Sequence, residues 1–238
     1  MIKALLFDFD GVIVDTEPLH YKGFLRVMKK YGYTMTYEHY KRNYLAFQDR
    51  DCFIGILNEI GMKYDEMFLN ALIEEKGEWF FPLLNELPIK VRGQEVVEEA
   101  IFTFEGLTDF IRDASRIYRL AIVSGAQKNE IEVILKRLGI FDCFVLIVSA
   151  GDYQKGKPDP EPYLVGYKRL KRLYPDVEIY NCVGVEDSFF GIKSVKSAGM
   201  KCIAVTNSYS KELLSQYGAD LIVDRLTSNM LPLVFSEF

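Results

Sequence analysis

The sequence has few of the residues that mark several common kinds of protein. Its four cysteines are isolated, with no CxxC pair, and its net charge at pH 7 is only −5. Isolated cysteines in mostly apolar surroundings indicate buried free thiols in a reducing compartment. The charge provides no concentrated basic surface of the kind that nucleic-acid-binding proteins display. We therefore expect no nucleic-acid partner. No apolar run reaches the length of a membrane span, so we expect no membrane partner either.

The remaining composition is that of an ordinary globular protein. The 238 residues are 49% hydrophobic and 26% charged, which is enough to bury a sizeable core. The length lies near the upper end for a single domain, so it is consistent with one domain that carries a second, inserted domain. Met1 leads directly into an apolar strand pattern, which leaves no room for a signal peptide. We expect a cytoplasmic protein that is a monomer or a weak homodimer.

Two aspartates follow the first apolar run of the chain. The segment Leu5–Val12 begins as a buried strand and then carries Asp8, Asp10 and Gly11. Side chains two apart on a strand lie on the same side, and glycine lets the backbone turn at once. Two carboxylates this close favour a cation between them, unless one is protonated. Mg²⁺ fits because one or two carboxylates typically bind it, whereas the alternative is a plain Asp-Gly turn.

The next part of the chain shows helical patterns. Apolar residues with helical spacing predict helices over 20–31, 51–60, 65–79 and 94–103. Gly32 follows the first of these as a C-cap would. Pro82 and Pro88 are expected to break the pattern. We therefore interpret residues 16–103 as an all-helical insertion.

After Gly106 apolar strands alternate with amphipathic helices. The expected strands lie at 118–123, 144–148, 179–185, 201–205 and 221–223. Continuous apolar strands that alternate with helices predict a parallel sheet covered on both faces. The strand before Asp8 belongs to the same sheet. Residues 1–15 and 104–238 are therefore predicted to form an α/β core domain, with residues 16–103 as a helical cap domain.

Polar residues gather where several of these strands end or in the loops nearby. Ligands of open parallel sheets bind at the carboxyl ends of the strands. For single residues an alternative stays open: Ser124 and the Glu186-Asp187 pair can be helix caps, and Lys157 can be a solvated loop charge. Their coincidence indicates a functional site. In chain order they are Asp8, Asp10, Ser124, Lys157, Glu186 and Asp187.

Taken together, these motifs resemble the haloacid dehalogenase-like hydrolases. The resemblance is to the branch that contains β-phosphoglucomutases and phosphoglycolate-type phosphatases, and it covers essentially the whole chain. The matching motifs are Asp8-Phe9-Asp10-Gly11-Val12 with Asp15, Ser124-Gly125, Lys157-Pro158, and Gly184-Val185-Glu186-Asp187-Ser188 followed by Gly191-Ile192. The resemblance implies a Rossmann-like α/β core with a helical cap inserted after the first motif.

The resemblance also implies a chemistry for the acidic residues. Asp8 would be the nucleophile that becomes an aspartyl phosphate, and Asp10 would act as general acid and base. Mg²⁺ would be bound by Asp8, the backbone carbonyl of Asp10 and Asp187, with Glu186 as a direct or outer ligand. Dehalogenases of the family attack carbon and need neither Mg²⁺ nor an acid at this place. Asp10 therefore favours a phosphate ester as the substrate.

Other residues are implied in substrate binding. Ser124, Gly125 and Lys157 would contact the phosphoryl group, because phosphoryl transfer depends on donors and cations around its oxygens. In the cap, Arg50 matches an arginine of the mutases and suits a carboxylate or a second phosphate. The alternative is that Arg50 only pairs with a neighbouring aspartate. His20 matches a linker histidine of the mutases, but a lone histidine is more typical of a satisfied surface group.

The implied function is a Mg²⁺-dependent phosphatase that hydrolyses a small phosphorylated metabolite. One alternative is a sugar-phosphate mutase of the β-phosphoglucomutase type. Against it, Ala46-Phe47 stands where the mutases carry Lys-Gly. The other alternative is a non-catalytic protein of the same fold that binds a phosphorylated ligand or regulates, since fold does not imply function.

Overall fold

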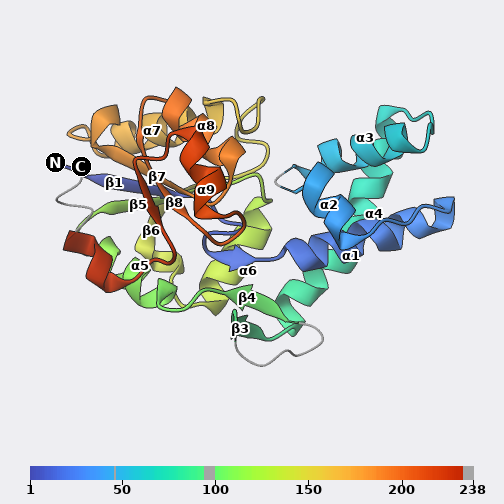
Figure 1. Cartoon of the computed structure of the whole chain (residues 1–238), viewed down its shortest axis with the longest axis horizontal. Coiled ribbons are helices and arrows are strands. Elements are labelled where there is room, and N and C mark those ends of the chain that lie inside the picture. Colours follow the sequence, from blue (N-terminus) through green and yellow to red (C-terminus); the bar gives the residue numbers. More distant parts are fainter. Residues whose placement is uncertain (46, 94–99, 233–238) are drawn as a thin grey trace. The chain divides into compact units, whose positions relative to one another are not determined.

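The structure, a computed structural model, describes residues 1–45, 47–93 and 100–232. The chain forms two compact units (Figure 1). The sheet unit comprises Met1–Asp15, Lys90–Val96 and Phe102–Phe238, and the helical unit comprises Thr16–Ile89 and Val97–Ile101. Each unit has its own hydrophobic core. Within the described ranges, no helix is long and apolar enough to cross a membrane.

The sheet unit is built on six parallel strands in the order β6-β5-β1-β7-β8-β9. They are β1 (Ala4–Phe7), β5 (Arg119–Val123), β6 (Phe144–Val148), β7 (Cys182–Glu186), β8 (Lys201–Val205) and β9 (Leu221–Val223). All four residues of β1 are apolar and buried, as expected for a strand that is covered on both faces. The predicted α/β fold with a parallel sheet is confirmed, and β6, β8 and β9 have the predicted bounds.

Helices cover both faces of this sheet. They are α5 (Leu107–Ser115), α6 (Lys128–Arg137), α7 (Glu161–Leu173), α8 (Phe189–Ser197) and the short α9 (Lys211–Leu214). In Figure 1, α7 and α8 lie on one face and α5 and α6 on the other. Single 3-10 turns occur at η2 (Phe141–Cys143), η3 (Ile179–Asn181), η4 (Ser215–Tyr217) and η5 (Ser228–Met230). The 3-10 turn η3 replaces the start of the strand predicted at 179–185.

The helical unit contains α1 (Glu17–Met28), η1 (Lys29–Tyr31), α2 (Tyr37–Asn43), α3 (Asp49–Glu59) and α4 (Glu66–Glu86). The chain leaves η1 at Gly32, whose positive φ of 74° suits glycine, as the sequence predicts. Two features differ from the prediction. The sequence analysis missed α2, and α4 continues through Pro82. Phe80 and Leu84 on either side of this proline are buried, and their burial outweighs the lost backbone hydrogen bond.

A small three-stranded sheet contains the remaining strands in the order β2-β4-β3, and β2 and β4 are antiparallel. They are β2 (Val14–Asp15), β4 (Ile101–Thr103) and β3 (Ile89–Val91). The helix predicted over 94–103 is therefore wrong for Ile101–Thr103, and its residues 94–99 lie outside the described residues. Segment 16–103 holds short strands besides its helices. β-branched Ile101 and Thr103 favour a strand, and the Thr103 hydroxyl donates a hydrogen bond to the Ile13 carbonyl at 2.9 Å.

Candidate active site

Asp8 lies directly after β1, at the carboxyl end of the sheet. Its backbone N–H donates to the Val185 carbonyl at 2.9 Å, which extends the pairing of β1 with β7 by one residue. Its Oδ1 accepts a hydrogen bond from the Phe9 N–H at 2.8 Å. The chain then turns, and the Gly11 N–H donates to the Val14 carbonyl at 2.7 Å. The buried Asp8 is therefore held at the carboxyl end of the sheet, its N–H by Val185 and its carboxylate by the Phe9 N–H.

Gly11 is required by the carboxylate of Asp187. Its φ is +78°, a conformation that suits glycine. A Cβ at this position would lie 1.8 Å from Asp187 Oδ2, so no other residue fits without displacing the carboxylate. Asp187 directly follows β7, the neighbour of β1 in the sheet. The first and fourth motifs are therefore in contact here, because the Asp187 carboxylate occupies the space that a side chain on Gly11 would fill.

Glu186, at the end of β7, is fully buried and accepts hydrogen bonds on both oxygens. Its Oε1 accepts from the Tyr163 hydroxyl at 2.7 Å and lies 2.7 Å from Lys157 Nζ. Its Oε2 accepts from the Asp187 N–H at 3.3 Å. A Cβ on Gly191 would lie 1.9 Å from Oε2, which explains the glycine of the fourth motif. The position of the Glu186 carboxylate is thus fixed by Tyr163, Lys157 and the backbone of Asp187.

Lys157 joins the acidic residues of the two strands. Its Nζ lies 2.8 Å from Asp8 Oδ1 and 2.7 Å from Glu186 Oε1. Burial disfavours the charged ammonium, but the attraction of Asp8 and Glu186 outweighs burial and raises the pKa of Lys157. Lys157 is therefore a permanent cation in the site at neutral pH.

One lysine does not balance the acids around it. The carboxylate oxygens of Asp8, Glu186 and Asp187 lie within 4.8 Å of one another. Burial, followed by the charge of Asp8, raises the pKa of Glu186 and of Asp187 above their usual range. All three are oxygen donors on rigid strand ends, the donor type that Mg²⁺ prefers. The cluster therefore fits a divalent cation, which would offset the repulsion that raises these pKa values.

Ser124 follows β5, the other neighbour of β1 in the sheet. Its buried hydroxyl oxygen accepts a hydrogen bond from the Ala126 N–H at 3.0 Å, so its proton can be donated to a bound anion. Its carbonyl accepts from the Tyr153 hydroxyl at 3.0 Å, a contact that the sequence analysis missed. Gly125 is half-buried beside it. The structure thus places the Ser124-Gly125 pair at the same edge as Asp8.

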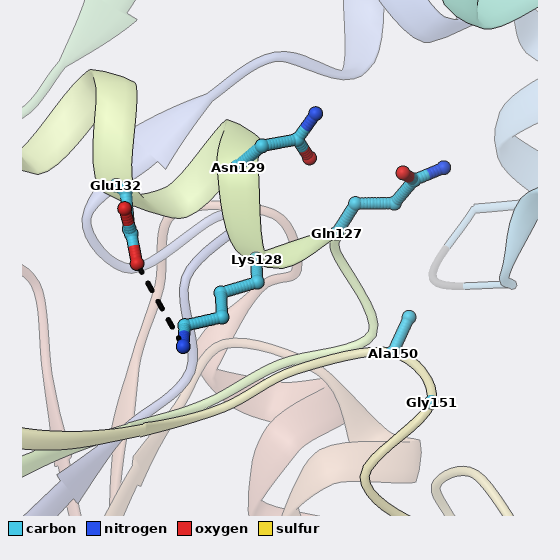
Figure 2. Close-up of a pocket in the computed structure, with 6 residues that line it drawn as sticks. All are labelled: Gln127, Lys128, Asn129, Glu132, Ala150 and Gly151. Atoms are coloured by element: carbon cyan, nitrogen blue, oxygen red, sulfur yellow. Dashed lines mark ion pairs between the residues drawn. The ribbon is translucent and has the colours of Figure 1, made fainter.

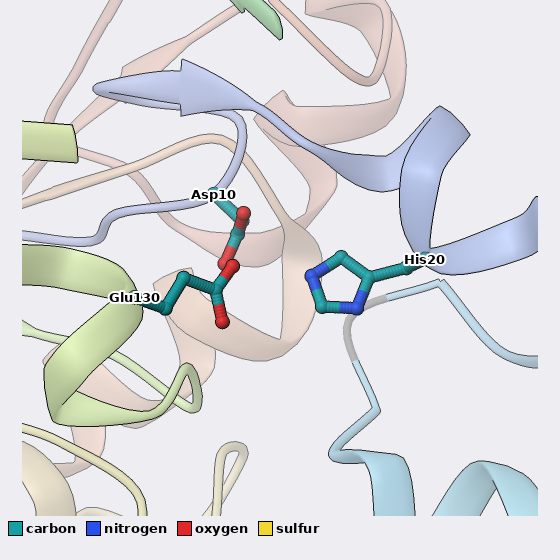
Figure 3. Close-up of side chains that lie close together, drawn as sticks. All are labelled: Asp10, His20 and Glu130. Carbon is teal, nitrogen blue, oxygen red and sulfur yellow. The ribbon is translucent and has the colours of Figure 1, made fainter. Parts of the chain in front are cut away.

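Asp10 faces a carboxyl group that the sequence analysis did not single out. Figure 3 shows the side chains of Asp10 and Glu130 directed toward each other, and their carboxylate oxygens lie within 4.8 Å. Glu130 is buried in the first turn of α6. In the sequence it is typical of an acid that complements a helix dipole, so no local pattern could single it out. Asp10 therefore has an acidic neighbour from α6 at the carboxyl end of the sheet.

An open pocket of about 680 Å³ lies at the same end of the sheet. Figure 2 shows its lining at the start of α6 and in the loop after β6, which is Gln127, Lys128, Asn129, Glu132, Ala150 and Gly151. Both segments follow strand ends at the carboxyl edge of the sheet. Lys128 Nζ lies 3.9 Å from a Glu132 oxygen on the exposed rim. The pocket therefore offers amides and charges, and no aromatic surface, to a bound molecule.

The two candidate residues of the cap belong to the helical unit. His20 Nδ1 lies 2.8 Å from the ammonium of Lys76, which is buried, so His20 has polar partners of its own. Arg50 NH2 lies 2.6 Å from Glu66 Oε1, and its side chain is 47% exposed. Its partner is therefore a glutamate of α4 and not a neighbouring aspartate. Ala46, at which the chain departs from the mutases, lies outside the described residues. The roles of His20 and Arg50 in binding stay predictions.

Comparison with known proteins identifies the family. The family model of the haloacid dehalogenase-like hydrolases matches residues 5–205. The chain belongs to this family. A phosphorylated carbohydrates phosphatase of Thermotoga maritima is 31% identical over 203 residues, which cover 85% of this chain and 84% of the relative. The chain is accordingly an enzyme of the phosphatase kind in this family, a phosphoric monoester hydrolase.

Mutases of the same family are also similar to this chain. The β-phosphoglucomutase of Bacillus subtilis is 26% identical over 238 residues, 100% of this chain and 96% of the relative. A crystal structure of β-phosphoglucomutase from Clostridium difficile superimposes with a TM-score of 0.80 at 26% identity, covering 100% of this chain and 97% of that one. The expected resemblance to this branch is therefore confirmed.

Proposed function

We propose that this haloacid dehalogenase-like hydrolase is a Mg²⁺-dependent phosphatase of a small phosphorylated metabolite. The observation that carries the proposal is the cluster of Asp8, Glu186 and Asp187 at the ends of two adjacent strands, with Lys157 from the loop between β6 and α7 paired to Asp8 and Glu186. It combines a fixed carboxylate nucleophile, a permanent cation and a set of oxygen donors for a metal ion. Phosphoryl transfer depends chiefly on this kind of positioning and charge stabilisation.

Asp8 and Asp187 are the proposed side-chain ligands of the ion, together with the backbone carbonyl of Asp10. Glu186 is better suited to position Lys157 than to bind the ion directly, because both of its oxygens already accept hydrogen bonds from the protein. When bound, Mg²⁺ would supply positive charge to the phosphoryl oxygens and to the carboxylates that face them.

In the first step, a carboxylate oxygen of Asp8 attacks phosphorus while the bond from phosphorus to the ester oxygen breaks. Ser124 and Lys157 stabilise the three phosphoryl oxygens. Asp10, in its protonated form, gives its proton to the leaving alcohol. In the second step Asp10 takes a proton from water, which attacks the aspartyl phosphate, releases inorganic phosphate and regenerates Asp8.

The pocket at the same end of the sheet favours a polyhydroxylated substrate. Its side chains are amides and charges at the start of α6, with only small residues opposite. Such groups bind hydroxyls by hydrogen bonds. The Thermotoga relative is named for phosphorylated carbohydrates. We therefore infer a phosphorylated sugar or polyol as the substrate class.

A mutase remains the second candidate, because the chain matches β-phosphoglucomutases over their whole length. The two reactions differ in the acceptor of the phosphoryl group from Asp8, which is water in the phosphatase and a second hydroxyl of the substrate in the mutase. Product analysis separates them. Sugar 1-phosphate that is converted to its 6-phosphate isomer, without release of inorganic phosphate, would establish the mutase.

The proposed function is tested by phosphate release from a panel of sugar and polyol phosphates and an aryl phosphate. We expect release with Mg²⁺, loss of release with EDTA and recovery when excess Mg²⁺ is restored. The Asp142→Asn variant is changed in the 3-10 turn η2, which precedes β6 and so lies at the amino end of the sheet, opposite to the site. It serves as a matched control and should keep full activity. Phosphorylated ligands that bind without any turnover across the panel would favour the non-catalytic alternative and contradict the proposal.

A further inference from the structure

The loop after β8 places two neighbouring side chains on the two acidic motifs. The Asn207 side-chain amide donates to the Gly11 carbonyl at 2.7 Å. The Ser208 hydroxyl donates to Asp187 Oδ2. Gly11 belongs to the turn after β1, and Asp187 directly follows β7. One short stretch of chain therefore links the turn that follows the nucleophile to a carboxylate of the fourth motif.

This loop is itself held in place. The Thr206 N–H donates to the Val223 carbonyl at 3.0 Å, which continues the pairing of β8 with β9. On the other side, Arg92 NH1 donates to the Asn207 carbonyl at 3.0 Å and lies 3.5 Å from Asp15 Oδ2. These contacts fix the backbone of residues 206 and 207. The hydrogen bonds of the Asn207 and Ser208 side chains therefore start from a well-held backbone.

Asp187 needs such support more than most carboxylates do. Its Oδ2 occupies the space that a Cβ on Gly11 would fill, so the carboxylate packs directly on the turn. A hydrogen bond to one carboxylate oxygen fixes the plane of the group and therefore the direction of the other oxygen. Partners that orient a metal ligand in this way typically change metal affinity by about 10- to 100-fold.

We propose that Ser208 is a positioning residue for Asp187 and Asn207 for the Gly11 turn, and that residues 206–208 thereby tune the affinity of the site for its divalent cation. The inference rests on the proposed Mg²⁺-dependent function. Neither residue contacts the reacting atoms in this assignment. Ser208 acts through Asp187, a proposed metal ligand, and Asn207 acts through the turn on which Asp187 packs.

The proposal is tested by isothermal titration calorimetry, which measures the affinity of the full chain for Mg²⁺ in the absence of substrate. We expect Ser208→Ala to weaken Mg²⁺ binding about tenfold and Ser208→Thr, which keeps the hydroxyl, to restore most of the affinity. Ser215→Ala is the matched control, because Ser215 is an exposed serine of η4 whose hydroxyl donates to the Glu212 carbonyl at 2.9 Å. It should bind as the wild type does.

Asn207→Ala provides a second, independent variant. Loss of its bond to Gly11 should also weaken Mg²⁺ binding, because the turn and Asp187 are in contact. Melting temperatures of all variants show whether each is folded. Wild-type affinity in a folded Ser208→Ala variant would overturn the inference while the proposed function stands. A wild-type protein that does not bind Mg²⁺ at millimolar concentration would instead overturn the proposed function, and the inference with it.

Discussion

At the scale of single residues, the proposed chemistry depends first on Asp8. We predict that Asp8→Asn abolishes measurable turnover, because an amide cannot attack phosphorus, while the volume of the side chain is almost unchanged. The variant should remain folded, since the Asp8 N–H still donates to the Val185 carbonyl and the amide oxygen of asparagine can still accept from the Phe9 N–H. Steady-state phosphate release and a thermal melt measure the two expectations. Near-normal activity would mean that water attacks directly or that another residue is the nucleophile.

Asp10 is predicted to act in both steps, and Asp10→Asn can separate them. An aryl phosphate has a good leaving group and needs little protonation, so this variant should still transfer the phosphoryl group to Asp8. Hydrolysis needs the base and should fall by a hundredfold or more, about the usual contribution of general acid–base catalysis. Intact mass spectrometry should then show a phosphorylated chain that persists, whereas Asp8→Asn shows none. Rapid turnover of Asp10→Asn would assign the acid–base role elsewhere.

Several residues of the site could be predicted from the sequence, and the reason is local. Asp8, Gly11, Ser124 and Asp187 stand next to the ends of apolar strands, so the sheet itself brings them together. Other contacts could not be predicted, because they depend on how loops fold against each other. The bond from Asn207 to Gly11 joins residues 196 positions apart, and neither side chain belongs to a local pattern.

At the scale of elements, the helical unit is held partly by a buried ion pair between α3 and α4. Lys76 of α4 is 1% exposed, and its Nζ lies 2.5 Å from Asp49 Oδ1 at the start of α3. The same ammonium lies 4.5 Å from the centre of the Phe24 ring on α1. Burial alone would raise the pKa of Asp49, but Lys76 and then His20 lower it below its usual value of 3.8. Three helices therefore meet at one charged group.

Asp49→Asn is predicted to lower the free energy of unfolding of the helical unit by about 3 kcal/mol at pH 7, since it leaves a buried ammonium unpaired. A carboxyl with a lowered folded-state pKa stabilises the fold above the unfolded value of 3.8 and loses this effect as the pH falls below it. The difference between wild type and variant should therefore shrink progressively below pH 3.8. Urea unfolding followed through Trp79, the one tryptophan of the chain and part of α4, measures it.

Glu66→Gln is the matched control for this prediction. It breaks the pair of Arg50 with Glu66, whose side chains are 47% and 71% exposed, and should change stability by no more than about 0.5 kcal/mol. Equal effects of the two variants at pH 7, or a difference for Asp49→Asn that stays constant as the pH falls from 3.8 through the lowered folded-state pKa, would show that the pair with Lys76 does not stabilise the unit.

The elements themselves were predictable where a single pattern dominates. The strands of the parallel sheet are continuous apolar runs, and α8 begins after Ser188, whose side chain accepts from the Gly191 N–H. The prediction failed where packing overrides local preference. α2 is rich in polar residues and tyrosine and is buried chiefly at Tyr40, so its apolar spacing is weak. α4 passes Pro82 because its buried face continues beyond it.

At the scale of the whole molecule, the proposed metal ligands all belong to one of the two units. Asp8, Asp10 and Asp187 lie in the sheet unit, while the helical unit has a separate hydrophobic core around Phe24. A ligand that binds only the folded state stabilises it by mass action, by about 2.7 kcal/mol at 100 times its Kd. Mg²⁺ should therefore stabilise the sheet unit directly and leave the core of the helical unit to its own contacts.

Hydrogen exchange with and without Mg²⁺ measures this distribution. At saturating Mg²⁺ we expect peptides that contain β1 and β7 to gain protection by up to about 2.7 kcal/mol at 100 times Kd, and peptides of α3 and α4 to change little. Asp187→Asn should reduce the gain, because it removes a proposed ligand and leaves the rest of the sheet intact. Equal gains in both units would show that the chain opens as a single cooperative body. No gain in β1 and β7 would contradict an ion bound between their ends, since the repulsion among their carboxylates would then be relieved by protons alone.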